Sequence, residues 1–187
     1  MRLIPRRRPD LPADAAEALG IVRGERVLAW SALVGDGYAV ATPAGLRLLT
    51  PFGKLIRRPW VEVDHLAWDA DSRTLAVWWV GSRQATGLEL PEDSYLPEVA
   101  HERWRSSVVA TREVPLPGRR SAMIALRKDI DGALSTQANL PTGVRAGDPE
   151  VAAVLAAAQA QLAGEAGVGA SPPTIDTAEP LWGSRDE

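Results

Sequence analysis

The segment Arg26–Thr42, which reads RVLAWSALVGDGYAVAT, is the part of the chain that decides its fold. Two apolar runs, 26–34 and 38–42, stand on either side of Gly35-Asp36-Gly37. Asp-Gly between apolar runs is a strong hairpin signal, because glycine tolerates the positive φ that tight hairpin turns require. We therefore expect two antiparallel strands joined by a turn at residues 35–37.

Further short apolar runs follow the hairpin, and each ends in a turn sequence rich in Gly, Pro, Asp or Ser. We expect strands at residues 46–50, 60–68, 74–80 and 86–90. Six short strands with tight turns between them favour an antiparallel meander over a parallel α/β sheet. A short helix at 13–19, ended by Gly20, should precede the meander.

The second half of the chain mixes helix and strand patterns. We expect a helix at 94–106, strands at 121–127 and 134–140, and either helix or strand at 108–116. Asp148 is a good N-cap with Pro149 at the first helical position, and apolar residues recur at helical spacing beyond it. The expected class is mainly β (α+β), closed by this C-terminal amphipathic helix.

Length and composition are those of one globular domain with tails. The chain has 187 residues, of which 24% are charged. We divide it into a basic N-terminal arm with a short helix (1–20), a β domain with its C-terminal helix (21–166), and a disordered acidic tail (167–187). The chain has no cysteine and no apolar run of about 20 residues, and no apolar core of a signal peptide follows its basic start. We expect a cytoplasmic protein without a transmembrane segment.

Charge is distributed unevenly along the chain. Residues 1–60 hold 10 Lys and Arg against 5 Asp and Glu, whereas the remainder holds 11 against 19. The dense basic runs are short, so we expect no specific nucleic-acid binding. Lys54, Arg57 and Arg58 are the candidate residues for binding an anionic ligand or, together with Arg6–Arg8, a membrane surface. A solvated loop and arm are the simpler interpretation.

Recognisable catalytic chemistry is missing from the sequence. The two histidines, His65 and His101, lack the spacing of a helical zinc pair, and we find no nucleophile elbow and no phosphate-binding loop. We therefore expect no catalytic residue, no metal and no cofactor. One enzymatic alternative stays open, a site around His65, Asp64 and Trp60, and it requires His65 to open into a concave pocket.

Seven tryptophans against one phenylalanine are an unusual aromatic balance. We expect Trp30, Trp60 and Trp68 to lie in the core. Successive strand residues point to opposite faces, so Trp78 and Trp79 cannot both point inward. We expect the C-terminal helix to cover the outer ring, and the alternative is that Trp78 and Trp79 belong to an aromatic interaction surface.

The acidic tail carries one apolar pair, Leu181 and Trp182. Such a pair is either incidental or a short docking motif, because one Trp buries much area at little ordering cost. If the motif docks, the basic face near Arg57 and Arg58 is the expected receiver.

Three segments of the chain resemble the bacterial pleckstrin-homology-like domains: Gly24–Leu28, Val40–Arg47 and Arg58–Val63. The resemblance implies an antiparallel bent barrel of seven strands, plugged at one end by a C-terminal helix, here the one from Pro149. The whole chain is also similar to conserved actinobacterial proteins, in keeping with its Ala- and Arg-rich usage. Eukaryotic members bind phosphoinositides through basic residues of the first hairpin, which 35–37 lacks, so we expect no phosphoinositide binding.

Together these features favour a non-enzymatic protein-interaction or assembly module. Its partner would be an unidentified protein or a second copy of the chain, as the resemblance to bacterial members implies. A peripheral membrane or anionic-ligand binding module and an enzyme with a site near His65 are the alternatives.

Overall fold

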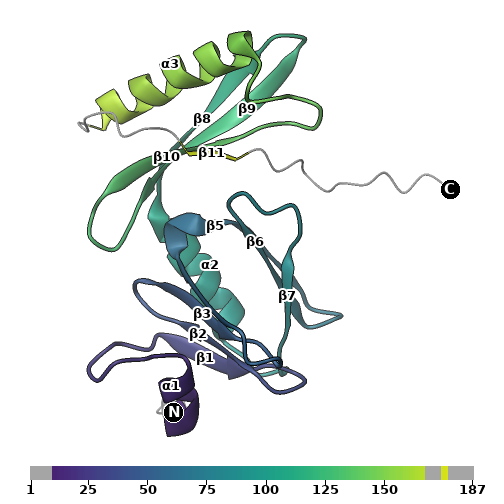
Figure 1. Ribbon diagram of the computed structural model, residues 1–187, viewed down its shortest axis with the longest axis vertical. Helices are drawn as coiled ribbons and strands as arrows, with labels where there is room; N and C mark the ends of the chain where they lie inside the picture. The colour runs from purple at the N-terminus through teal and green to yellow at the C-terminus, as the bar shows by residue number, and fades with distance from the viewer. Residues whose placement is uncertain (1–9, 167–173, 177–187) are drawn as a thin grey trace, which may run out of the picture.

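The computed structural model describes residues 10–166 and 174–176, which form two units stacked along the long axis of the molecule (Figure 1). The first unit runs through residue 107 and contains two small sheets and two helices. The second unit begins at residue 108 and contains one sheet and one helix. Each unit has its own cluster of buried apolar side chains.

The first sheet contains the predicted hairpin. Its strands are β1 (Ala29–Ala32), β2 (Tyr38–Ala41), β3 (Gly45–Leu49) and β4 (Leu55–Pro59), paired antiparallel in that order. Ala32 lies opposite Tyr38, and Gly35 and Asp36 have φ values of 86° and 66°. The antiparallel hairpin at residues 35–37 is therefore confirmed, with its positive φ values at Gly35 and at the non-glycine residue Asp36.

The second sheet closes the core of the first unit. A short 3-10 helix, η1 (Trp60–Glu62), leads into β5 (Val63–Asp69), β6 (Thr74–Trp79) and β7 (Thr86–Glu89). The N–H of Val34 donates to the carbonyl of Glu89, so the end of β1 touches the end of β7. Helix α2 (Leu96–Ser107) packs between the sheets with Leu96 and Ala100 fully buried, and α1 (Ala13–Ala18) lies outside them.

The second unit is a sheet with a helix on one face. Its strands are β8 (Val108–Leu116), β9 (Arg120–Lys128), β10 (Leu134–Asn139) and β11 (Thr174–Asp176), in the order β11-β10-β9-β8. The β10–β11 pair is parallel, and the other pairs are antiparallel. Helix α3 (Pro149–Glu165) buries Val151 and Leu155 against the sheet, and the Asp148 side chain accepts a hydrogen bond from the Glu150 N–H at 3.1 Å, as an N-cap does.

The mainly β class and the C-terminal helix are confirmed. The described strands nevertheless form three sheets and no closed barrel. Residues 60–62 are a 3-10 turn where a strand was expected, 108–116 is a strand, and β4 was not expected at all. Strand β11 lies within the segment 167–187 that was expected to be disordered.

The expectation that the C-terminal helix covers the outer ring of Trp78-Trp79 was wrong. Helix α3 packs on β8, β9 and β10, while Trp79 points into the first core, against which α2 packs. The physical reason is that the residues after α2 form the separate sheet of the second unit, whose apolar face needs a helix of its own.

Candidate functional site at the junction of the two units

The sheet of the second unit, β8 to β11, has one face under α3 and the other turned toward the first unit (Figure 1). Because successive strand residues point to opposite faces, Ile124 and Leu126 pack under α3, whereas Met123 and Arg127 point the other way. On β10, Ala138 faces α3 and Gln137 faces the first unit. The α3-free face thus carries both apolar and hydrogen-bonding side chains.

A cleft of about 650 Å³ lies where this face meets β5 and the C-terminal end of α2. We call it the junction cleft. One side is lined by Asp64, His65 and Trp104, and the other by Met123, Arg127 and Gln137. Met123 lies in the middle of β9 and is 44% exposed.

An irregularity in β5 explains why two neighbouring residues both reach the cleft. The register of β5 on β6 shifts between Val63 and His65, as in a β-bulge. Bulges change the direction of side chains, so Asp64 and His65 both line the cleft where a regular strand would separate them. The Trp104 indole N–H on α2 donates to the carbonyls of Val63 at 3.1 Å and Asp64 at 3.0 Å, which fixes the bulge against the helix.

Arg127 is the main polar contact between the units, and it is only 2% exposed. Its Nη2 donates to the carbonyl oxygen of Trp60 and to Oγ of Ser107, both at 2.7 Å, and its Nη1 donates to Oε1 of Gln137 at 3.3 Å. Burial lowers the pKa of Arg127 to about 10, an effect that the Asp64 charge opposes. The guanidinium is therefore still charged at neutral pH.

Gln137 connects this cation to the carboxylate of Asp64. Its Nε2 donates to Oδ1 of Asp64 at 2.9 Å, while its Oε1 accepts from Arg127. Oδ2 of Asp64 lies 2.9 Å from Nδ1 of His65. A continuous hydrogen-bonded series, Arg127–Gln137–Asp64–His65, thus crosses from the second unit to the first.

His65 ends this series in an aromatic contact. Its ring stacks on that of Trp78, with centroids 4.1 Å apart and planes 11° apart. Asp64 holds Nδ1, so the imidazole is oriented in the way that a carboxylate orients a catalytic histidine. His65 lines the cleft, which is the concavity that the enzymatic alternative requires.

The two adjacent tryptophans do not form one surface. Trp79 is buried and its Nε1 donates to Oγ1 of Thr86 at 2.9 Å, whereas Trp78 lies on the opposite face of β6, against His65. Trp60 is buried as expected and donates to the carbonyl of Thr42. Trp68, expected in the core, is 37% exposed, because it lies in the last three residues of β5, all of which are exposed.

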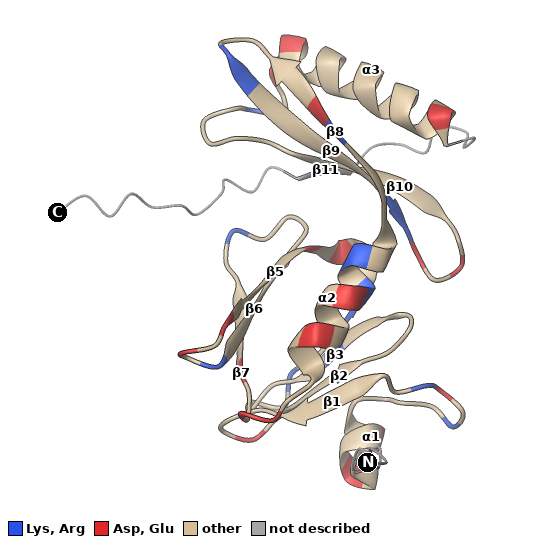
Figure 2. Cartoon of the chain, turned by 180° about the vertical axis from the view of Figure 1, so that it is seen from behind, with Lys and Arg blue, Asp and Glu red and all other residues tan. Residues whose placement is uncertain are grey.

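The three candidate cations, Lys54, Arg57 and Arg58, are exposed but do not point one way. Arg57 shares a strand face with Arg47 and lies against Gly20 at the end of α1, whereas Arg58 lies on the other face and pairs with Glu62. Figure 2 shows basic and acidic segments alternating over both units. Anionic-ligand binding there stays a prediction, which cosedimentation with anionic liposomes at low and high salt would test.

Other expectations concern the tail, metals and membranes. Leu181 and Trp182 lie outside the described residues. Within residues 10–166 and 174–176, no group of three or more His, Asp or Glu side chains is arranged to hold a metal ion. Among the helices of this same part, none has both the length and the apolar character to span a membrane.

Sequence reasoning missed Arg127, Gln137 and Trp104. Arg127 falls on the polar side of the alternation in β9, which normally indicates solvent. The one available signal was the pairing of a β9 arginine with a β10 glutamine on neighbouring strands, both on the face away from the apolar residues.

In comparisons with protein-family models, curated proteins and solved structures, nothing matches the chain.

Proposed function

We propose that this chain is a non-enzymatic protein-interaction module whose partner binds in the junction cleft. The observation that carries the proposal is the α3-free face of the sheet in the second unit, where the exposed side chain of Met123 lines a cleft of about 650 Å³. An exposed apolar side chain with convergent hydrogen-bonding groups is typical of binding sites.

The chemistry of the cleft suits an extended polypeptide segment. Met123 offers a flexible apolar contact, and such side chains adapt to different partners. Asn139 and Thr111 are exposed and provide donors and acceptors on either side of it. Arg105 at the edge adds a positive charge for an acidic residue of the partner.

The architecture of the first unit supports a pleckstrin-homology-like fold. Four strands and then three strands form its two sheets, and a helix follows directly. In this interpretation α2 takes the role of the closing helix that the sequence analysis assigned to 149–165. The second unit is then an addition that turns one side of this fold into a cleft.

Affinity capture with matched variants tests the proposal. Met123→Arg places a charge in the cleft, and Ala157→Arg places the same charge on the exposed side of α3. We expect a partner captured by the wild-type chain and by Ala157→Arg to be lost with Met123→Arg, while circular dichroism shows all three folded. Equal capture by both variants would contradict binding at the cleft.

An enzyme with His65 as proton acceptor is the second candidate, favoured by the Asp64–His65 hydrogen bond inside a concave site. An activated-ester probe such as p-nitrophenyl acetate distinguishes the two. The binding module should hydrolyse it no faster than its His65→Gln variant. A rate that falls in His65→Gln and Asp64→Asn would favour the enzyme.

A further inference from the structure

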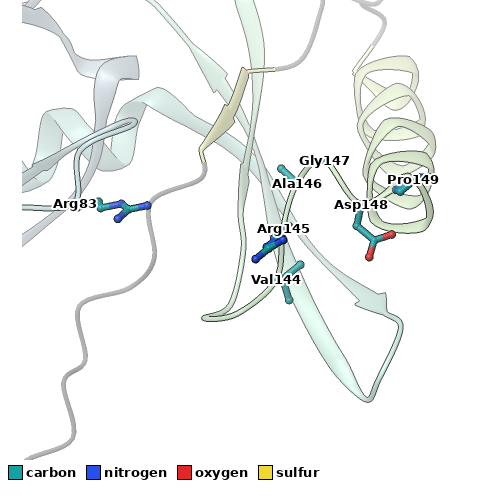
Figure 3. A pocket seen from close by; sticks show the side chains of 7 residues that line it. All are labelled: Arg83, Val144, Arg145, Ala146, Gly147, Asp148 and Pro149. Atoms are coloured by element: carbon teal, nitrogen blue, oxygen red, sulfur yellow. The ribbon is translucent and has the colours of Figure 1, made fainter.

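A second cavity lies between the two units, separate from the junction cleft. It has a volume of about 800 Å³ and is lined by Arg83, from the loop between β6 and β7, and by residues 144–149, from the loop before α3 and the first residue of that helix. Figure 3 shows Arg83 and Arg145 extending into this space from opposite sides, one from each unit. We call it the two-arginine pocket.

The positive charge of this pocket is not neutralised within the described part of the chain. Both arginines are exposed, and within residues 10–166 neither guanidinium has a hydrogen-bond or ion-pair partner. The acid that lines the pocket, Asp148, accepts a hydrogen bond from the Glu150 N–H and points away from Arg145 (Figure 3). Two unpaired arginines that face each other favour an anionic occupant.

The residues that follow strand β11 in the sequence are a suitable occupant of the pocket. Strand β11 pairs with β10 along Gln137–Asn139, and in Figure 3 this short yellow strand lies between the loop of Arg83 and the loop of Arg145. Eleven residues, 177–187, follow Asp176, and they carry Glu179, Asp186 and Glu187 against one arginine. Glu179 is three residues beyond β11, within about 10 Å of chain.

We propose that the two-arginine pocket binds the acidic C-terminal segment 177–187 of the same chain, with Glu179 between Arg83 and Arg145. Leu181 and Trp182 then follow after Pro180 and reach the apolar part of the lining at Val144. Because the two arginines belong to different units, the segment links the units at a second place. This receiver replaces the face near Arg57 and Arg58, where Glu62 already pairs with Arg58.

The test follows the indole N–H resonance of Trp182 in the full-length ¹⁵N-labelled chain, assigned with Trp182→Phe. We expect a resonance shifted from that of free tryptophan, which moves toward the free position at high salt and in the Arg83→Glu/Arg145→Glu double variant. Glu179→Arg should have the same effect, and Arg83→Glu combined with Glu179→Arg should restore the shift. Lys54→Glu, the matched charge reversal elsewhere on the first unit, should leave it unchanged.

Several results would overturn the proposal. One is a Trp182 resonance at the free position in the wild-type chain, and another is a shift that survives the double variant. A third is failure of the charge exchange to restore the shift although circular dichroism shows a folded chain. A shift that depends on protein concentration would assign the segment to a second copy and would equally contradict docking within one chain.

Discussion

At the scale of single residues, Arg127 is the position where a conservative substitution should lower the free energy of unfolding most. Its planar guanidinium reaches the Trp60 carbonyl, Ser107 and Gln137 at once, which a single ammonium group cannot do. The charge is buried but bonded to neutral acceptors, and Asp64 lies one residue further along the hydrogen-bonded series. The contact therefore depends on geometry more than on charge.

We expect Arg127→Lys to lower the free energy of unfolding by about 2 kcal/mol, because buried acceptors lose their donors. Urea denaturation measures the change. Arg119→Lys in the exposed turn between β8 and β9 is the control and should shift the value by less than about 0.5 kcal/mol. Equal stability of the Arg127→Lys variant and the wild-type chain would contradict this account of the contact.

Gln159 shows the opposite case, a buried polar group without a hydrogen-bond partner among the described residues. It is 3% exposed on the sheet side of α3, and neither atom of its amide is hydrogen-bonded within this part of the chain; the same holds for Oγ1 of Thr136. Gln159→Leu keeps the size of the side chain and removes the unpaired groups, so we expect stabilisation by about 1–2 kcal/mol. Thermal unfolding checks this, with exposed Gln161→Leu as control, and a lower melting temperature for Gln159→Leu would contradict it.

At the scale of elements, the sequence predicted the turns and helix ends that are determined by the residues at those positions. The 35–37 hairpin and the start of α3 at Asp148-Pro149 were both predicted from turn and cap residues. Strand β4 was missed because Lys54, Arg57 and Arg58 interrupt any apolar alternation at the edge of the sheet. Arg127 was missed because the face it occupies is covered by the other unit, which no local pattern reveals.

The pairing of β3 with β4 depends on Gly45. A Cβ there would lie 2.1 Å from the carbonyl oxygen of Arg58, so the two backbones meet too closely for any side chain. We expect Gly45→Ala to destabilise the first unit by more than about 1 kcal/mol, because neighbouring backbone cannot move aside as a side chain can. Gly87→Ala, whose Cβ would meet nothing nearer than 3.5 Å, is the control. Similar denaturation midpoints for the two variants would be the contrary result.

The last residue of β5, Asp69, is an acid with a shifted pKa. Hydrogen bonds from Ser72 and from the Asp71 N–H lower the pKa of Asp69 from its ordinary value of 3.8. Because the pKa of Asp69 is lower in the folded state, these bonds contribute to stability above pH 3.8. This contribution is lost as the pH falls through the pKa of the folded state. A carboxyl NMR titration should show a midpoint below 3.8 that rises in Ser72→Ala. An unshifted midpoint in the wild-type chain would contradict this.

At the scale of the whole molecule, two separate apolar cores are joined by hydrogen bonds from Arg127 and Gln137. Six of the seven tryptophans, Trp30 to Trp104, lie in the first unit, and α3 lies in the second. Fluorescence therefore reports the first unit, and hydrogen exchange of α3 amides reports the second. The two probes can measure how strongly the units stabilise each other.

We expect both probes to give one urea midpoint in the wild-type chain, because the hydrogen bonds of Arg127 tie the cores together. In Arg127→Lys the midpoints should separate, as they do when contacts between units are few. Arg119→Lys is again the control and should keep a single midpoint. Coincident midpoints in both variants would show that the units are coupled elsewhere.

The parallel pairing of β11 with β10 has a consequence for how the molecule behaves in a crowded solution. A strand at the edge of a sheet offers a row of free N–H and C=O groups, which another chain can extend into a shared sheet and finally an aggregate. Three residues of β11 occupy that row along Gln137–Asn139. A proteolytic cut after α3 would leave both cores intact and would still uncover this edge. The cleaved molecules should therefore be folded but should associate through this edge. Light scattering should detect their aggregates before circular dichroism or fluorescence shows any unfolding.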